Sequence, residues 1–194
     1  MKYLILASTV ALLAPSVTLA DFCDLVAKDN ASSCRVNADK EGAKILGNWL
    51  RTKPEMAQSS SGKKGYYTAG TTVAVGMLGV PHNNRYRLTI QCFAGERSMT
   101  IDALPYMLGL ANTGRNNAFE LTFNVDDKAA YTEKWPLNWH RRELQAPSNS
   151  QLAASLHRAS KLTVRTSGIN GNKSDVGYTY AVNGFDSVNS GLCK

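Results

Sequence analysis

The only adjacent pair of carboxylates in this sequence is Asp126-Asp127. Such a pair can bind a cation or take part in acid–base chemistry, but more often it caps a strand end or forms a turn. Shortly downstream, Trp135 and Trp139 lie four residues apart and close to Tyr131. Positions four apart face the same side of a strand, so the two indoles would form an exposed platform for a sugar or protein partner, or fill the core. These five residues are the candidate binding residues.

Motifs of common enzymes are missing from the sequence. It contains no Gly-x-Ser-x-Gly elbow, no His-Glu-x-x-His pair and no phosphate-binding glycine loop. The three histidines, His82, His140 and His157, are far apart and have polar neighbours, as is typical of surface positions. We therefore predict no catalytic residue, no cofactor and no metal. An enzyme that uses Asp126, Asp127 or His140 is a competing hypothesis.

Four cysteines, Cys23, Cys34, Cys92 and Cys193, allow three disulfide pairings. We predict Cys23–Cys34, which are close in sequence, and Cys92–Cys193, which would join a central strand to the C-terminus. A zinc site would need clustered ligands, and these spacings are far too wide. With both disulfides formed, no thiol is left to act as a nucleophile.

The N-terminus has the features of a cleavable export signal. Met1-Lys2 carries a positive charge, Tyr3 to Leu13 is mostly apolar, and Thr18-Leu19-Ala20 supplies small residues for a signal peptidase. The apolar stretch is too short to span a bilayer, which takes roughly 20 residues. Cys23 is only the third residue after the cleavage point, whereas a lipoprotein needs a cysteine directly there. We expect removal of residues 1–20, no membrane anchor, and a protein in the periplasm or secreted.

The mature chain is basic, but its charges are dispersed. Removing the signal takes away one lysine and leaves 21 basic against 15 acidic residues, a net charge of +6. The densest basic groups are the pairs Lys63-Lys64 and Arg141-Arg142. Long basic runs interleaved with aromatic residues are absent, so we predict no nucleic-acid partner. The charge indicates either a solvated basic surface or an anionic partner such as a membrane surface or cell-wall polymer.

Hydrophobic periodicity divides the mature chain into three parts. Ile45, Leu46, Trp49 and Leu50 lie at helical spacing, which predicts an N-terminal helical segment over 21–54 tied by the first disulfide. Residues 55–66 are polar and rich in small side chains, as in a flexible linker. Residues 67–194 predict a β-rich domain with a short helical tail at 185–193. Its expected strands are 71–75, 85–92, 98–102, 119–125, 130–140, 161–165 and 178–182.

Only one helix, at 149–160, interrupts these strands, and a parallel βαβ fold would need one after nearly every strand. The fold class expected is therefore α+β, mainly β: an antiparallel β-sandwich or open barrel with an N-terminal disulfide-tied helical segment and one internal helix.

Several short segments occur in the same order as in a known bacterial family. They are Cys23 to Cys34, Leu88-Thr89-Ile90-Gln91-Cys92, Phe123-Asn124-Val125-Asp126, Lys161 to Arg165, and Tyr180-Ala181-Val182-Asn183-Gly184-Phe185 with the terminal Cys193. With them, the chain resembles the VasI/TagO family of type VI secretion-associated periplasmic proteins. The family's Arg before the second cysteine and its Tyr-Asp after it are replaced here. Similar terminal sheets occur in other exported bacterial proteins, including invasion-associated locus B-like ones.

The resemblance implies a β-rich periplasmic accessory domain without established catalytic activity. We therefore expect an exported accessory or binding protein that contacts a protein partner in the cell envelope, in a type VI secretion system or other envelope machinery. The alternative is a periplasmic inhibitor or immunity-type protein acting on a cell-wall enzyme.

Overall fold

The computed structural model describes residues 20–78, 86–105, 107–108, 117–167 and 175–193. The predicted signal peptide, except for its last residue, lies outside the described residues, as does His82. Within the described part, no helix has the length and apolar character needed to cross a membrane.

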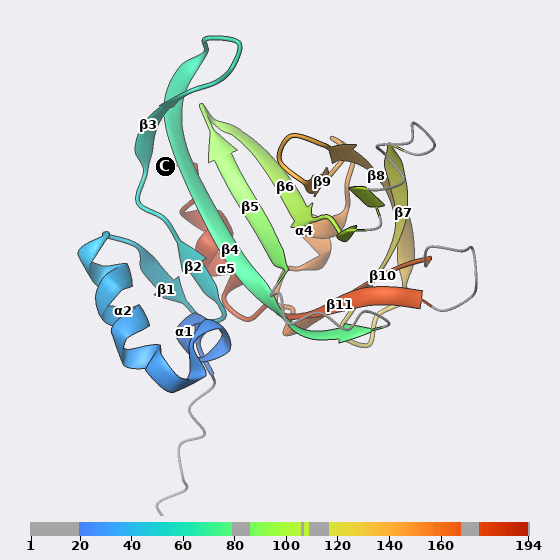
Figure 1. Cartoon of the computed structure of the whole chain (residues 1–194), viewed down its shortest axis with the longest axis horizontal. Helices are drawn as coiled ribbons and strands as arrows, with labels where there is room; N and C mark the ends of the chain where they lie inside the picture. Colours follow the sequence, from blue (N-terminus) through green and yellow to red (C-terminus); the bar gives the residue numbers. More distant parts are fainter. Residues whose placement is uncertain (1–19, 79–85, 106, 109–116, 168–174, 194) are drawn as a thin grey trace, which may run out of the picture.

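Eight antiparallel strands form a closed barrel (Figure 1). They pair in the order β4-β11-β10-β7-β8-β9-β6-β5, and β5 pairs again with β4. Their bounds are β4 (Lys64–Leu78), β5 (Arg87–Phe93), β6 (Glu96–Asp102), β7 (Ala118–Val125), β8 (Tyr131–Asn138), β9 (Glu143–Gln145), β10 (Lys161–Ser167) and β11 (Asp175–Ala181). The expectation of a mainly β fold is confirmed, but the sheet is neither a sandwich nor open. It closes because β4 is long enough to pair with β5 along one side and with β11 near its end.

The barrel interior is filled by the alternating side chains of its strands. On β7, Phe119, Leu121, Phe123 and Val125 are all buried, as their alternation predicts. Helix α5 (Phe185–Ser190) packs on the same core, and the ring of Phe185 lies 5.5 Å from that of Trp49. The second disulfide, Cys92–Cys193, joins β5 to the chain just after this helix, as predicted. The C-terminal tail is thus part of the barrel's core and is covalently attached to it.

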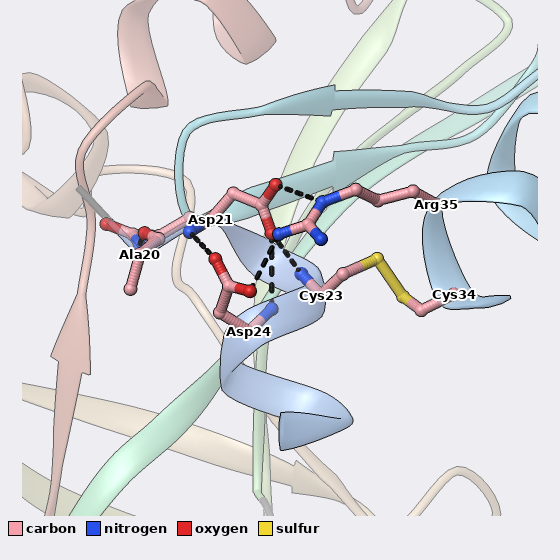
Figure 2. A network of polar contacts seen from close by, with 7 residues as sticks. Ala20, Asp21, Cys23, Asp24, Cys34 and Arg35 are labelled. Carbon is pink, nitrogen blue, oxygen red and sulfur yellow. Dashed lines mark hydrogen bonds and ion pairs between the residues drawn. A yellow bond between two sulfur atoms is a disulfide. The ribbon is translucent and has the colours of Figure 1, made fainter. Parts of the chain in front are cut away.

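The N-terminal helical segment is held by a disulfide and a polar network (Figure 2). It consists of α1 (Phe22–Val26), a 3-10 helix η1 (Lys28–Asn30) and α2 (Ala31–Lys40), and the Cys23–Cys34 disulfide joins α1 to α2 as predicted. Asp21 caps α1: its carboxylate accepts hydrogen bonds from the backbone of Cys23 and Asp24, and Asp24 accepts one from the Asp21 backbone in return. Arg35 on α2 donates to both carboxylates, at 2.9 and 2.7 Å.

Residues 41–53 are not helical, contrary to the expectation. They form a hairpin of β1 (Lys44–Leu46) and β2 (Trp49–Arg51), and β2 also pairs with β4. The turn contains Gly47 at φ +62°, where an added Cβ would lie 2.5 Å from the carbonyl oxygen of Asn183. The prediction failed because two short apolar pairs separated by two residues fit a helical face and a tight hairpin equally well.

The predicted linker is also a hairpin. Residues Glu55–Gln58 form β3, which pairs with the first residues of β4 and with no other described strand. The turn between them is closed by a hydrogen bond from the Ser59 amide to the carbonyl of Lys63, and it contains Gly62 at φ +84°. Its composition is polar because the hairpin rises above the barrel (Figure 1) and has little core to contact.

The predicted internal helix is much shorter than 149–160. Only Leu152–Ser155 is α-helical (α4), although Leu152, Leu156 and Ala159 are buried as the helical spacing suggested. The strand β9, which completes the barrel between β8 and β6, was not predicted because it has only three residues.

Candidate functional site

The predicted aromatic platform is not formed. Trp135 is completely buried, and its Nε1 donates a 2.8 Å hydrogen bond to Glu133. Trp139 is 47% exposed but lies in the turn after β8, where the two-residue alternation of the strand has ended. Tyr131 is half-buried, and its hydroxyl is 2.8 Å from that of Ser155. The two indoles therefore do not share an exposed face.

The carboxylate pair has a structural function at Asp126. This residue has φ +49° and its carboxylate accepts hydrogen bonds from the backbone amides of Ser160 and Lys161 and from the Ser160 hydroxyl. Burial raises the pKa of Asp126, but these donors outweigh it and hold the pKa below its ordinary value. Asp127 is exposed beside it. The pair thus forms the turn that ends β7 and joins it to the start of β10.

The described histidines lie at the surface and apart from these residues. His140 is exposed, and the Nδ1 of His157 lies within hydrogen-bond distance, 3.0 Å, of a carboxylate oxygen of Asp186. Among the described residues, no cluster of three His, Cys, Asp or Glu side chains is arranged to hold a metal ion.

A pocket of about 630 Å³ lies between the β3–β4 hairpin and the barrel. Its walls come from six separate parts of the chain: β3 and its turn, β4, the β5–β6 hairpin, the segment around β9, α4 and α5. The lining side chains that carry a charge or a hydrogen-bonding group are Gln58, Ser59, Tyr67, Gln91, Glu96, Arg97, Ser98, Arg141, Gln145, Ser148, Ser150 and Asn189.

Hydrogen bonds fix the polar groups along one wall of this pocket. The Tyr67 hydroxyl donates to the side-chain oxygen Oε1 of Gln91 (3.1 Å), and the side-chain nitrogen Nε2 of Gln91 donates to the Ser98 hydroxyl (2.9 Å). Burial raises the pKa of Tyr67, so this phenol stays protonated and acts as a donor. Asn189 keeps a buried side-chain oxygen that has no hydrogen-bond partner within the described chain. The polar groups of Tyr67, Gln91 and Ser98 are therefore held in fixed positions along this wall.

The charged groups of the lining leave an excess of positive charge. The only lining carboxylate, Glu96, is paired with Lys63 at 2.5 Å, and the hydrogen bond from Lys63 lowers the pKa of Glu96. Arg97 uses one guanidinium nitrogen to donate to the carbonyl of Asn189. The Arg141 guanidinium has no hydrogen-bond partner in the part of the chain that the structure describes. Arg97 and Arg141 can therefore bind an anionic group on an occupant, and Glu143, which interacts electrostatically with Arg141, offsets part of this positive charge.

The β3–β4 hairpin has two different faces. Ala57 and Tyr67 lie on the face that lines the pocket. Met56 and Tyr66 are direct cross-strand partners on the opposite face, where they are 62% and 61% exposed. Gln58 and Lys64, the next cross-strand partners along the hairpin, are exposed as well, and Gln58 also contributes to the pocket lining. We call these four residues, Met56, Gln58, Lys64 and Tyr66, the outer hairpin face.

The sequence analysis predicted neither the outer hairpin face nor the pocket. The sequence did contain a signal for a hairpin. Met56 and Tyr66 lie on either side of a Ser-Ser-Ser-Gly segment, which is typical of a turn between two strands. The pocket gave no comparable signal, since its six contributing segments are far apart in sequence.

Comparisons with known proteins include a distant structural neighbour. No family model matches the sequence, and no curated protein matches it. A similar solved structure is that of invasion associated protein B from Bartonella henselae, with 11% sequence identity and a TM-score of 0.48. The match covers 77% of this chain and 94% of that chain.

Proposed function

We propose that this chain is an exported accessory protein of the bacterial envelope that acts by binding another protein. The two disulfides fit a protein that matures in an oxidising compartment. The signal-like residues 1–20 support delivery to the periplasm. A binding role agrees with the sequence, in which we found no catalytic motif.

The observation that carries this proposal is the outer hairpin face. Adjacent exposed apolar side chains that are surrounded by polar residues are candidate contact surfaces. Met56 and Tyr66 meet this description, because Gln58 and Lys64 lie beside them on a hairpin that rises above the barrel. Methionine and tyrosine are also enriched at protein interfaces.

The resemblance to the VasI/TagO family supports a more specific version of the proposal. In that version the partner belongs to a type VI secretion system. The segments that carry the resemblance lie largely in β5, β7, β10 and β11, which form the barrel and leave the hairpin free for a partner.

Site-specific cross-linking in the periplasm tests the proposal. A photoreactive amino acid is placed at Tyr66, and the same residue is placed at Val36 as a control. Val36 is 53% exposed but lies on α2, away from the hairpin. We expect a defined cross-linked envelope protein at Tyr66 that is lost on Met56→Ser, and none at Val36. The same products at both positions, or none at Tyr66, would contradict the proposal.

The shape of the hairpin also favours the second candidate function, inhibition of a cell-wall enzyme. A hairpin that rises above its barrel (Figure 1) can enter the cleft of an enzyme, as inhibitory loops on rigid scaffolds do. The test is a panel of purified peptidoglycan hydrolases assayed with the intact protein and with a variant that has Ser59 to Lys63 shortened. Equal hydrolase rates with and without the protein would exclude this function.

A further inference from the structure

We propose that the free edge of β3 binds an extended, acidic segment of a partner protein as an additional β-strand. This inference rests on the proposed binding function, and it specifies the chemistry of the partner and the way it binds. The starting observation is that β3 pairs with β4 on one side and with no described strand on the other. In Figure 1, β3 is the outermost strand of the hairpin.

The hydrogen-bond pattern shows which backbone groups of β3 point outward. In an antiparallel pair, every second residue exchanges hydrogen bonds with its partner. The Ser59 amide donates to Lys63, so by alternation Ala57 and Glu55 also bond toward β4. The amides and carbonyls of Met56 and Gln58 must then point away from β4, toward the free edge.

The opposite strand supports this assignment. The carbonyl of Tyr66, which lies across from Met56, accepts a 3.0 Å hydrogen bond from the Ala94 amide. It therefore points away from β3, as expected for a pair that shares no hydrogen bond. The free edge thus presents two donors and two acceptors, enough to align a short incoming strand. Backbone pairing of this kind is a common way for proteins to bind extended peptides.

Charge complementarity indicates the composition of the incoming segment. An added strand would place alternate side chains on the two faces of the hairpin. On the outer hairpin face they would lie beside Met56 and Gln58, and the exposed Lys64 is the cross-strand partner of Gln58 on β4. On the other face, the one that lines the pocket, the side chains of β3 are Glu55 and Ala57. An extended segment matches this arrangement when its acidic side chains lie on the outer hairpin face, toward Lys64, and its apolar side chains lie on the other, which keeps its carboxylates away from Glu55.

The experiment is an NMR titration of the mature protein with a seven-residue, end-blocked peptide that alternates glutamate and valine. We expect the amide resonances of Met56 and Gln58 to shift and to gain protection from hydrogen exchange. Those of Glu55 and Ala57, which already bond to β4, should change less. Changes confined to other parts of the protein, or no changes, would overturn the proposal.

Two variants make the test specific. Gln58→Pro removes an outward amide that β4 does not use, and we expect it to weaken peptide binding about tenfold relative to Gln58→Ala. Lys64→Glu leaves the backbone intact, and we expect it to shift the preference to a peptide with lysine in place of glutamate. Equal binding by both Gln58 variants, or no change of preference with Lys64→Glu, would refute strand addition at this edge.

Other occupants give different results. A concentration-dependent dimer in sedimentation that is abolished by Gln58→Pro would mean that the edge binds a second copy of this chain, and would overturn the proposal. If cross-linking at Tyr66 captures an envelope protein while the peptide fails to bind, strand addition is wrong but the proposed function stands. If the peptide binds and the cross-linking recovers nothing, the proposed function fails instead.

Discussion

Removing the Cys92–Cys193 disulfide should destabilise the protein more than removing the Cys23–Cys34 disulfide, because it closes a much longer loop. The perturbation is replacement of both cysteines of one pair by alanine. Alanine is preferred to serine because Cys92 is almost fully buried, and a serine hydroxyl would need a hydrogen-bond partner there.

The expected magnitudes follow from the lengths of chain that the two bonds close. Cys92 and Cys193 are 101 residues apart, and Cys23 and Cys34 are 11 apart. From loop-closure entropy, the long loop contributes about 4.7 kcal/mol and the short loop about 2.8 kcal/mol. We therefore expect the two double variants to differ by about 2 kcal/mol in their free energy of unfolding.

The assay is urea denaturation followed by circular dichroism, with the wild-type protein and both double variants compared at one pH. The change of unfolding free energy with urea concentration should be steeper for both variants than for wild type, because their denatured chains are less constrained. A larger loss for the short loop than for the long one would refute the reasoning. It would mean that contacts in the folded protein decide the effect of each disulfide.

Three further predictions concern a glycine, a carboxylate and a tryptophan. Gly70→Ala should lower the unfolding free energy by about 1–3 kcal/mol, because the new methyl group would overlap the side chain of Val188, and Val188→Ala should partly restore stability in thermal denaturation. The pKa of Asp126 is lowered in the folded state. Its contribution to the free energy of unfolding is therefore fully present above the pKa of the unfolded chain, about 3.9, and is lost as the pH falls through the folded-state pKa. In urea denaturation, Asp126→Asn should cost about 1 kcal/mol at pH 7 and nothing near pH 2; an equal cost at both values would contradict this. Iodide should quench the fluorescence of Trp139 alone, because the two other tryptophans are fully buried. Trp139→Phe should therefore abolish iodide quenching in a fluorescence titration.

Strands with a regular alternation of side chains could be predicted from the sequence. Phe119 to Val125 is an example, since each apolar residue in it is buried. Both disulfides could be predicted too, because four cysteines in an exported chain leave few choices. Closure of the barrel could not, since it depends on the strand Lys64–Leu78 pairing on both of its sides, and its sequence is rich in glycine and small residues that carry little pattern.

The candidate site was harder to predict for a different reason. Trp135 and Trp139 were grouped by a spacing that holds only inside a strand, and β8 ends at Asn138, between them. In contrast, Met56 and Tyr66 were placed in a linker because their neighbours are polar. A polar composition indicates exposure to solvent. It does not distinguish a flexible linker from a hairpin that packs against little of the hydrophobic core.

The long disulfide also determines how the protein would respond to mechanical force. Tension applied between Ala20 and Cys193 would pass through the Cys92–Cys193 bond, so the six barrel strands from β6 to β11 would carry none of it. With both disulfides intact, about 60 residues are free to extend, which gives a maximum length of about 20 nm. Reduction would triple that length to about 60 nm. A protein built in this way can be pulled by its ends while the chain between Cys92 and Cys193 bears no tension along its backbone.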